Sequence, residues 1–197
     1  MKQFLLTGIL ALALLGFAPL QAQDSHLPIR IGLMDHSHAF GNFWFLGYSY
    51  NPALMLGTEH ILKAEGNYDF HLTGNLGFYH QSQSQTALFL NSEIGYRYRL
   101  NRWSANARMG LGYAHTFYPG PIYAVSGNQF EEVSQAGAPR FQPSISVGIG
   151  YRFGDDPYSP ELGLRYMLAA DLPLNLYTSL HQMVGLEFTF YPFQPQS

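Results

Sequence analysis

The sequence contains no cysteine, which excludes a disulfide framework, a thiolate metal site, a thiol nucleophile and a lipid-modified cysteine at the N-terminus. Charged side chains are also scarce, at 12% of the 197 residues, whereas a soluble domain carries ~25%. Lysine is the rarest of them, because only Lys2 and Lys63 occur. The formal net charge of −3 argues against a basic nucleic-acid-binding protein, so no nucleic-acid partner is expected.

Apolar residues are nonetheless abundant, at 47% of the chain with 16% aromatics, while the mean hydropathy is only −0.07. Apolar and polar residues must therefore be finely interleaved. This composition excludes intrinsic disorder, which requires low hydrophobicity together with high charge. The length is that of one domain.

Residues 1–23 are predicted to be a cleaved secretory signal peptide. A lysine supplies the positive start, Phe4–Leu15 is an almost unbroken apolar run, and the segment ends near Ala22, a small residue suited to cleavage. A transmembrane anchor is the alternative, but the run is short and is followed by a glycine and a proline. The remaining chain, residues 24–197, lacks a run of about 18 apolar residues, which a spanning helix requires.

Strict two-residue alternation dominates the rest of the chain. In the last such segment, Val184, Leu186 and Phe188 alternate with Gly185 and Glu187. This is the pattern of a strand with one apolar and one mixed face. The alternation occurs in eight segments: residues 29–33, 54–62, 69–78, 88–100, 106–117, 144–153, 162–172 and 183–191.

The mixed face of these strands distinguishes a membrane barrel from a soluble one. A soluble barrel would cover its outer surface with lysine and glutamate, whereas this face is poor in lysine and rich in glycine, serine, asparagine and arginine. Small residues suit the cramped interior of an eight-stranded barrel, and tyrosine and phenylalanine cluster toward strand ends, as in aromatic girdles. We therefore predict an all-β fold, an eight-stranded antiparallel up-and-down transmembrane β-barrel in the bacterial outer membrane.

The connections alternate in length, as in bacterial outer-membrane barrels with short periplasmic turns and longer extracellular loops. The predicted turns are residues 64–67, 101–102 and 154–160, and the predicted extracellular connections are residues 36–51, 81–85, 119–141 and 173–180. Residues 43–50 look like a further strand, which would break the even count. We interpret them as an extracellular extension of the second strand, with Pro52 at a bulge or edge position.

Glycine–aromatic motifs carry a resemblance to a known group of proteins. Residues 75–79 (NLGFY), 92–98 (SEIGYRY) and 110–113 (GLGY) resemble segments of small, largely uncharacterised outer-membrane β-barrel proteins of Bacteroidetes-type bacteria. The architecture is similar to that of the OmpA transmembrane domain, OmpX and NspA. The final strand, GLEFTF at 185–190, resembles the signal that the barrel-assembly machinery recognises, although further residues follow it here. The resemblance implies outer-membrane lipids and this machinery as partners.

Ten charged residues fall on the predicted inner face: Arg30, Glu59, Glu93, Arg97, Arg99, Arg108, Arg152, Arg165, Asp171 and Glu187. They could form an ion pathway or an anion site, or they could pair into a plug. Eight strands leave an interior that side chains just fill, and an unpaired buried charge is very costly, so the plug is favoured. Six arginines against about four carboxylates leave extra positive charge, which asparagines, tyrosine hydroxyls or trapped water are expected to satisfy.

Five histidines fall in or near the predicted extracellular connections: His36, His38, His80, His115 and His181. Since His36 and His38 are two residues apart, both would point to one side of a strand and could share a metal ion. No carboxylate or third histidine stands at a matching spacing, so polar residues at the headgroup level are the favoured interpretation. No metal or cofactor site is predicted.

An enzyme is an alternative from another class. The motif at 80–82 (HQS) resembles the His-x-Ser pair of the lipid A deacylase family, but Gln83 stands where that family has asparagine. The motif at 35–37 (DHS) holds three catalytic residue types, yet His36 and Ser37 would face opposite sides of a strand. Because a catalytic triad is recognised by geometry and not by adjacency, no catalytic residue is predicted.

The long connection at 119–141 is more apolar than a solvated loop, with Ile122, Tyr123, Val125 and Phe130. It could bind a partner, or it could fold over the barrel mouth. We predict a non-catalytic barrel with a closed lumen that is structural or mediates interactions through its extracellular loops. A lipid A- or phospholipid-modifying hydrolase with rim residues, and a small-solute or ion channel, are the alternatives.

Overall fold

The computed structural model of the chain describes residues 27–37, 50–82, 84–126, 129–133, 137–172 and 180–192. The predicted signal peptide at 1–23 lies outside the described residues, as do residues 43–49 of the expected strand extension.

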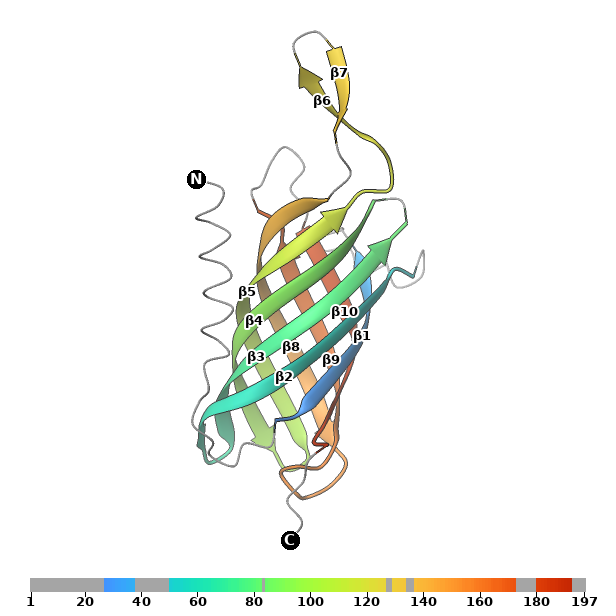
Figure 1. Cartoon of the computed structure of the whole chain (residues 1–197). Coiled ribbons are helices and arrows are strands. Elements are labelled where there is room, and N and C mark those ends of the chain that lie inside the picture. The colour runs from blue at the N-terminus through green and yellow to red at the C-terminus, as the bar shows by residue number, and fades with distance from the viewer. Residues whose placement is uncertain are drawn as a thin grey trace.

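Eight long strands form one closed barrel. They are β1 (Ile29–Ser37), β2 (Pro52–Glu65), β3 (Tyr68–Gln81), β4 (Gln85–Leu100), β5 (Trp103–Phe117), β8 (Ala138–Arg152), β9 (Glu161–Ala170) and β10 (Leu180–Phe190). Each strand pairs antiparallel with its neighbours, and β1 pairs with β10 to close the sheet (Figure 1). The predicted fold class is confirmed.

A separate hairpin lies between β5 and β8 in the chain. Its strands, β6 (Ile122–Ser126) and β7 (Gln129–Val133), form a two-stranded sheet of their own. The hairpin projects beyond one end of the barrel (Figure 1). The sequence predicted only a long connection at 119–141, so these two strands are an addition to the predicted eight. The barrel closes without them.

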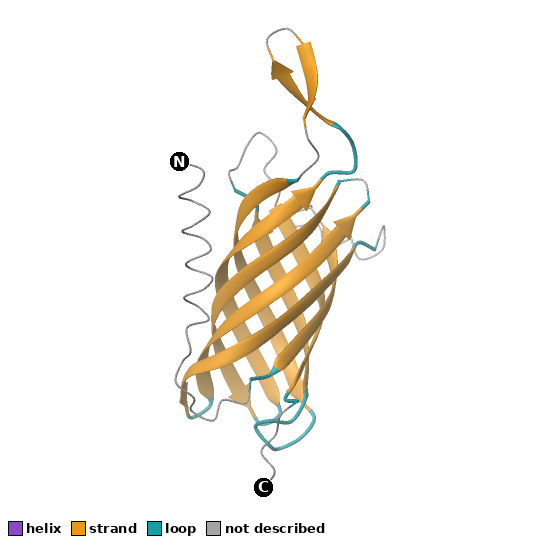
Figure 2. Ribbon diagram, in the orientation of Figure 1, coloured by secondary structure: helices purple, strands orange, loops and turns teal. Residues whose placement is uncertain are grey.

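The described part of the chain is built from strands joined by turns and loops (Figure 2). It holds no helix long and apolar enough to cross a membrane. Strands β2–β3, β4–β5 and β8–β9 are joined by residues 66–67, 101–102 and 153–160, which confirms the three predicted turns to within two residues. We call this the turn end of the barrel and the opposite end, which bears the hairpin, the loop end.

Strand β2 contains a local irregularity. Its register against β3 shifts between Ile61 and Lys63, which is a β-bulge. Pro52, expected at a bulge or an edge, is the first residue of β2 and lies opposite Asp35. Proline is tolerated at the start of a strand because the missing N–H breaks no interior ladder bond.

Burial alternates along the strands with a period of two. In β4, residues 91, 93, 95 and 97 are buried, while residues 92, 94 and 96 are exposed. On the outer face, large apolar side chains are bare, with Leu33 61% and Leu186 53% exposed. An apolar exterior around a polar interior is the inverse of a soluble protein, and it is the surface that a lipid-facing barrel requires.

Candidate functional site

Charged side chains form a column along the barrel lumen. Eight of the ten residues predicted to face inward are buried: Arg30, Glu59, Glu93, Arg97, Arg108, Arg165, Asp171 and Glu187. Arg99 and Arg152 are half-buried. The strands direct these side chains inward because alternate residues of a strand face opposite sides of the sheet.

Glu187 of β10 lies at the centre of the column. Its carboxylate accepts hydrogen bonds from Arg30 of β1 (2.5 Å, Nη2 to Oε2), Arg165 of β9 (3.1 Å, Nη1 to Oε2) and Arg108 of β5 (3.3 Å, Nη2 to Oε1). One carboxylate therefore joins side chains from four strands.

Arg165 extends this cluster across the lumen to Glu93 of β4. Its Nη2 donates to both carboxylate oxygens of Glu93, at 2.6 and 2.7 Å. Strands β9 and β4 are not neighbours in the barrel, so the guanidinium bridges separate walls. Glu93 also accepts a hydrogen bond from Asn75 Nδ2 (3.2 Å). Charge-assisted hydrogen bonds of this kind are stronger than neutral ones.

A second charged cluster lies toward the turn end and contains Asp69, which is not among the ten predicted residues. Asp69 is fully buried and accepts hydrogen bonds from Arg97, at 3.0 and 3.1 Å, and from Arg99. Arg97 also donates to Glu59 (2.5 Å). Because Arg30 lies 3.8 Å from the same Glu59, the two clusters are continuous.

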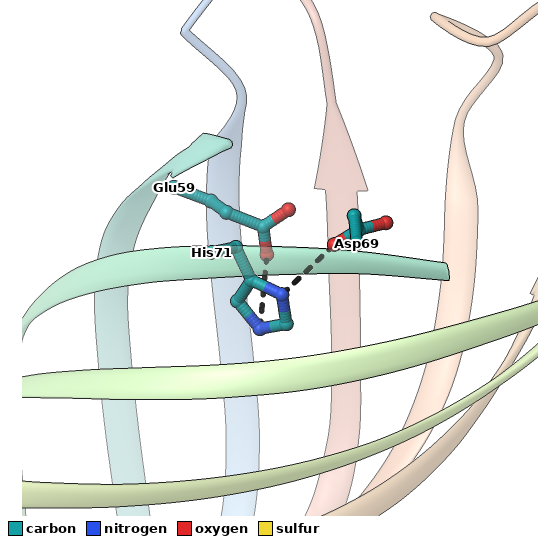
Figure 3. A group of neighbouring side chains, drawn as sticks. All are labelled: Glu59, Asp69 and His71. Carbon is teal, nitrogen blue, oxygen red and sulfur yellow. Dashed lines mark hydrogen bonds and ion pairs between the residues drawn. The ribbon is translucent and has the colours of Figure 1, made fainter. Parts of the chain in front are cut away.

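His71 and two carboxylates of this cluster have the donor types of a metal site (Figure 3). His71 Nδ1 is 3.0 Å from Asp69 Oδ1, and His71 Nε2 is 4.0 Å from Glu59 Oε2. Both carboxylates, however, already bind the guanidinium of Arg97, a permanent positive charge that repels a cation. The arrangement is an ion-pair cluster, and we assign no metal to it.

The predicted excess of positive charge in the lumen is smaller than the sequence suggested. Asp69 adds a buried carboxylate to the four expected. Glu161 adds a further carboxylate at the turn end, where it lies opposite Arg152 in the β8–β9 register and accepts a hydrogen bond from Ser104 Oγ (2.5 Å). Carboxylates therefore supply some of the acceptors that were expected from neutral groups and water.

An apolar layer separates the charged column, except for Asp171, from the loop end. Five buried side chains belong to it: Met34, Met55, Phe89, Met167 and Met183. The guanidinium of Arg165 contacts this layer, with Nη1 3.6 Å from Met55 Sδ and Nη2 3.5 Å from Met167 Sδ. We call these five residues the methionine layer; the sequence did not predict it as a unit.

A third polar cluster lies beyond the methionine layer, toward the loop end. His36 Nε2 and His181 Nδ1 are 2.9 Å apart, and His181 Nε2 is 3.1 Å from Asp171 Oδ2. Gln142 Nε2 donates to the other oxygen of Asp171 (2.9 Å), and Tyr79 stacks on His36 with ring centroids 4.0 Å apart. All five side chains are buried. We call this the loop-end histidine cluster.

In the structure, His36 lies next to His181 of β10. The sequence instead suggested His38 as its neighbour. His38 lies outside the described residues, so the expected His36–His38 pair has no structural test. His115 Nδ1 is 2.8 Å from the hydroxyl of Tyr113, and neither belongs to the loop-end histidine cluster.

The residues of the two sequence motifs considered for catalysis, 80–82 and 35–37, lie in different environments. His80 is exposed and its Nδ1 is 2.8 Å from Thr86 Oγ1. In the motif at 35–37, His36 is buried in the lumen, whereas Asp35 accepts a hydrogen bond from the backbone N–H of Asn51 (2.8 Å). The three residues of that motif therefore do not form a triad with one another.

No family model matches the sequence, and no curated protein matches it. Solved structures match it in fold. The outer membrane enzyme PagL matches with a TM-score of 0.50 at 9% identity, over 83% of this chain and 98% of PagL. The N-terminal β-barrel domain of Pseudomonas aeruginosa OprF gives a TM-score of 0.48 at 12% identity, over 83% and 97%. Neisserial surface protein A (NspA) gives 0.44 at 9% identity, over 85% and 97%.

At these identities the likeness concerns the fold alone. The chain has the closed eight-stranded fold of small bacterial outer-membrane barrels. Together with the apolar exterior, this fold agrees with the predicted location in the bacterial outer membrane.

Proposed function

We propose that the protein is a structural or interaction-mediating outer-membrane barrel with a closed, charge-plugged lumen, and that it is not an enzyme. The observation that carries the proposal is the position of Arg165. Its guanidinium bridges Glu93 and Glu187 across the lumen and also contacts the methionine layer.

Opening the lumen to ions would cost free energy, which favours a closed lumen. An eight-stranded barrel holds little more than its own side chains. A cavity of about 10 Å³ beside Asn106, Arg165 and Glu187 has room for about one water molecule. An ion path would require these buried ion pairs to separate, and a buried charge left without its partner costs about 3–5 kcal/mol. A role that needs no conduction is therefore the best supported.

We propose that a partner binds at the loop end of the barrel. The hairpin of β6 and β7 forms a sheet of its own, apart from the barrel. Strand edges without partners are templates for pairing with another chain. We infer that this hairpin and the neighbouring connections contact an extracellular partner.

Export and insertion belong to the same proposal. Residues 1–23 would direct secretion, and the barrel-assembly machinery would recognise the last strand, β10. N-terminal sequencing of protein isolated from the outer membrane is expected to begin at residue 23 or 24. Recovery of the protein from the soluble periplasmic fraction without detergent would contradict the proposal.

Planar-bilayer recording tests the closed lumen. The purified protein is expected to give no stable unit conductance, and the variant Arg97→Ala is expected to lose stability without opening a path. A porin of 16–18 strands, which leaves a water channel, is the positive control. Reproducible conductance whose ion preference shifts on Arg97→Glu would show that the lumen is an open pathway.

Mass spectrometry of lipid A and phospholipids tests the absence of catalysis. Cells with and without the gene are expected to give the same lipid profile. Removal of an acyl chain by the wild-type protein, but not by His80→Ala, would favour the hydrolase alternative and overturn the non-catalytic proposal.

A further inference from the structure

We propose that the barrel wall between β8 and β9 opens sideways near the loop end and admits the hydroxyl-bearing head of an outer-leaflet lipid to Gln142 and Ser144. This inference goes beyond the proposed function, because a structural barrel does not require a lipid site. It rests on a backbone hydrogen bond that Pro143 cannot make, on two buried polar atoms beside it, and on the single residue pair that closes the wall beyond it.

Pro143 removes one hydrogen bond from the ladder between β8 and β9. The regular pairing of the two strands ends at Ser144, and Phe141 and Leu172 form an isolated bridge beyond it. Hydrogen-bonded pairs of an antiparallel ladder recur every second residue, so Pro143 and Ala170 should form the next such pair. Because proline has no N–H, the carbonyl oxygen of Ala170 receives no donor from β8.

This gap is unusual in a wall that faces lipid. Proline in a sheet is found on edge strands, at the first residue of a strand or at bulges, whereas β8 pairs with β5 on one side and with β9 on the other. A backbone carbonyl without a donor is costly in hydrocarbon. Ala170 is the last residue of β9, so the gap lies toward the loop end, where lipid heads carry hydrogen-bond donors.

Two buried polar side chains flank Pro143 on the inner face of β8. Gln142 and Ser144 are 1% and 6% exposed, and Gln142 Nε2 donates to Asp171 Oδ1 across the wall (2.9 Å). Among the residues that the structure describes, Gln142 Oε1 and Ser144 Oγ have no hydrogen-bond partner. Such atoms are rare in native proteins and require an explanation. A hydroxyl group can satisfy both, because it donates to Oε1 and accepts from Oγ.

One residue pair closes the wall on the loop-end side of the gap. The N–H of Phe141 donates to Leu172 O (3.0 Å), and the N–H of Leu172 donates to Phe141 O (2.7 Å). This bridge is the last pairing of β8 with β9 among the described residues. On the outer face, Phe141 and Ile145 are 42% and 56% exposed and offer apolar surface to lipid chains. Gln142 lies beyond the methionine layer, so the opening leaves the charged column closed.

A disulfide across the wall tests the opening, and the chain has no cysteine of its own to interfere. In Phe141→Cys/Leu172→Cys the two Cα atoms are about 5.5 Å apart, the separation of a hydrogen-bonded antiparallel pair, which a disulfide can span. Ile149→Cys/Leu164→Cys joins an outward-facing pair of the same two strands and is the matched control. Each variant is first checked for folding by its anomalous migration on unboiled gels.

The probe is a neutral glucosyl diacylglycerol with a photoactivatable group near its head, added to phosphatidylcholine vesicles that hold the folded protein. Phosphatidylcholine with the same group is the chemical control, because its head has no hydroxyl. Mass spectrometry is expected to place the glycolipid label at residues 141–145 and to find little phosphatidylcholine label there. Oxidation of the 141–172 pair should abolish the glycolipid label and reduction should restore it, whereas the oxidised 149–164 pair should label as the wild type does.

Ser144→Ala removes the hydroxyl that has no partner and is expected to weaken glycolipid labelling. Ser146→Ala is its matched control, because Ser146 Oγ already donates to Glu93 Oε1 (3.4 Å), and it should label as the wild type does. Equal labelling of residues 141–145 by the two lipids, or glycolipid labelling that the oxidised 141–172 disulfide leaves unchanged, would overturn the proposal.

Hydrogen exchange gives a second measurement that needs no lipid. Pro143→Ala supplies the missing N–H, so exchange of the Leu172 amide should slow about fivefold, the factor that corresponds to one net backbone hydrogen bond. Unchanged exchange at Leu172 would show that Pro143 does not weaken the wall and would also overturn the proposal. The closed lumen would still stand, because conductance tests it independently.

Discussion

At the scale of single residues, a few buried carboxylates each serve several arginines. Glu187 contacts Arg30, Arg108 and Arg165, and it is only 8% exposed. Removing one partner from a buried ion pair leaves a charge without compensation, which costs far more than the pair itself contributes. The stability of the column therefore belongs to the set of charges and cannot be divided among single pairs.

Glu187→Gln is expected to destabilise the barrel strongly. The substitution keeps the size of the side chain but removes the negative charge that three guanidiniums share. We expect a loss of about 3–5 kcal/mol, the cost of breaking a buried pair. Urea unfolding in lipid vesicles, followed by tryptophan fluorescence, measures it.

Asp155→Asn is the control for this measurement. Asp155 also pairs with an arginine, since Arg102 Nε is 2.9 Å from its Oδ1, but its side chain is 84% exposed at the turn end. Exposed pairs contribute little because water solvates both ions. A loss of stability in Glu187→Gln no greater than in Asp155→Asn would show that the column does not depend on its charges.

At the scale of strands, the alternation of apolar and polar residues predicted most of the fold. It placed the eight barrel strands and their faces, because a side-chain period of two leaves a strong signal wherever one face meets lipid. The hairpin of β6 and β7 was interpreted as a loop. A two-stranded ribbon buries little surface, so its sequence carries a weak pattern.

The contacts of the candidate site were harder to predict from the sequence, because they depend on the register between strands. The alternation puts Asp69 on the inner row of β3 but does not show that it meets Arg97. His36 and His181 are 145 residues apart and come together only because β1 pairs with β10. Nothing in the spacing of either histidine indicates the other, whereas His36 and His38 are obvious neighbours in the sequence.

Two glycines of β3 offer a matched test of the packed lumen. Gly77 faces inward, and a Cβ added there would overlap the ring of Phe89 in the methionine layer. Gly74 faces outward, and a Cβ added there would have no atom within 4 Å. Phe89 is 2% exposed, so its ring has no free space to occupy.

Gly77→Ala is therefore expected to cost about 1–3 kcal/mol, the penalty of overpacking a filled interior. Gly74→Ala should be neutral or slightly stabilising, because it only restricts the unfolded chain. Urea unfolding of the two variants in the same vesicles compares them directly. Equal stability of the two variants would mean that the lumen around Phe89 is loosely packed.

At the scale of the whole molecule, the barrel separates two environments. Its outer face is apolar and bare, and its inner face holds ion pairs shielded from lipid by the sheet. The same arginine therefore has opposite effects on the two sides. It is stabilised inside by carboxylates, whereas on the lipid face it has no counter-ion and must leave water.

Leu186→Arg tests this separation at a position where a charge on the lipid face should cost the most free energy. Leu186 lies near the middle of β10, is 53% exposed, and has Leu33 and Leu164 as its neighbours across β1 and β9. An arginine on the lipid face near the bilayer midplane costs about 2–4 kcal/mol, falling to about 0–1 kcal/mol near the interfaces. Leu180→Arg, at the loop end of the same strand, is the control. Unfolding in vesicles should show the larger loss at residue 186, and equal stability of the two variants would mean that this face does not cross the hydrocarbon core.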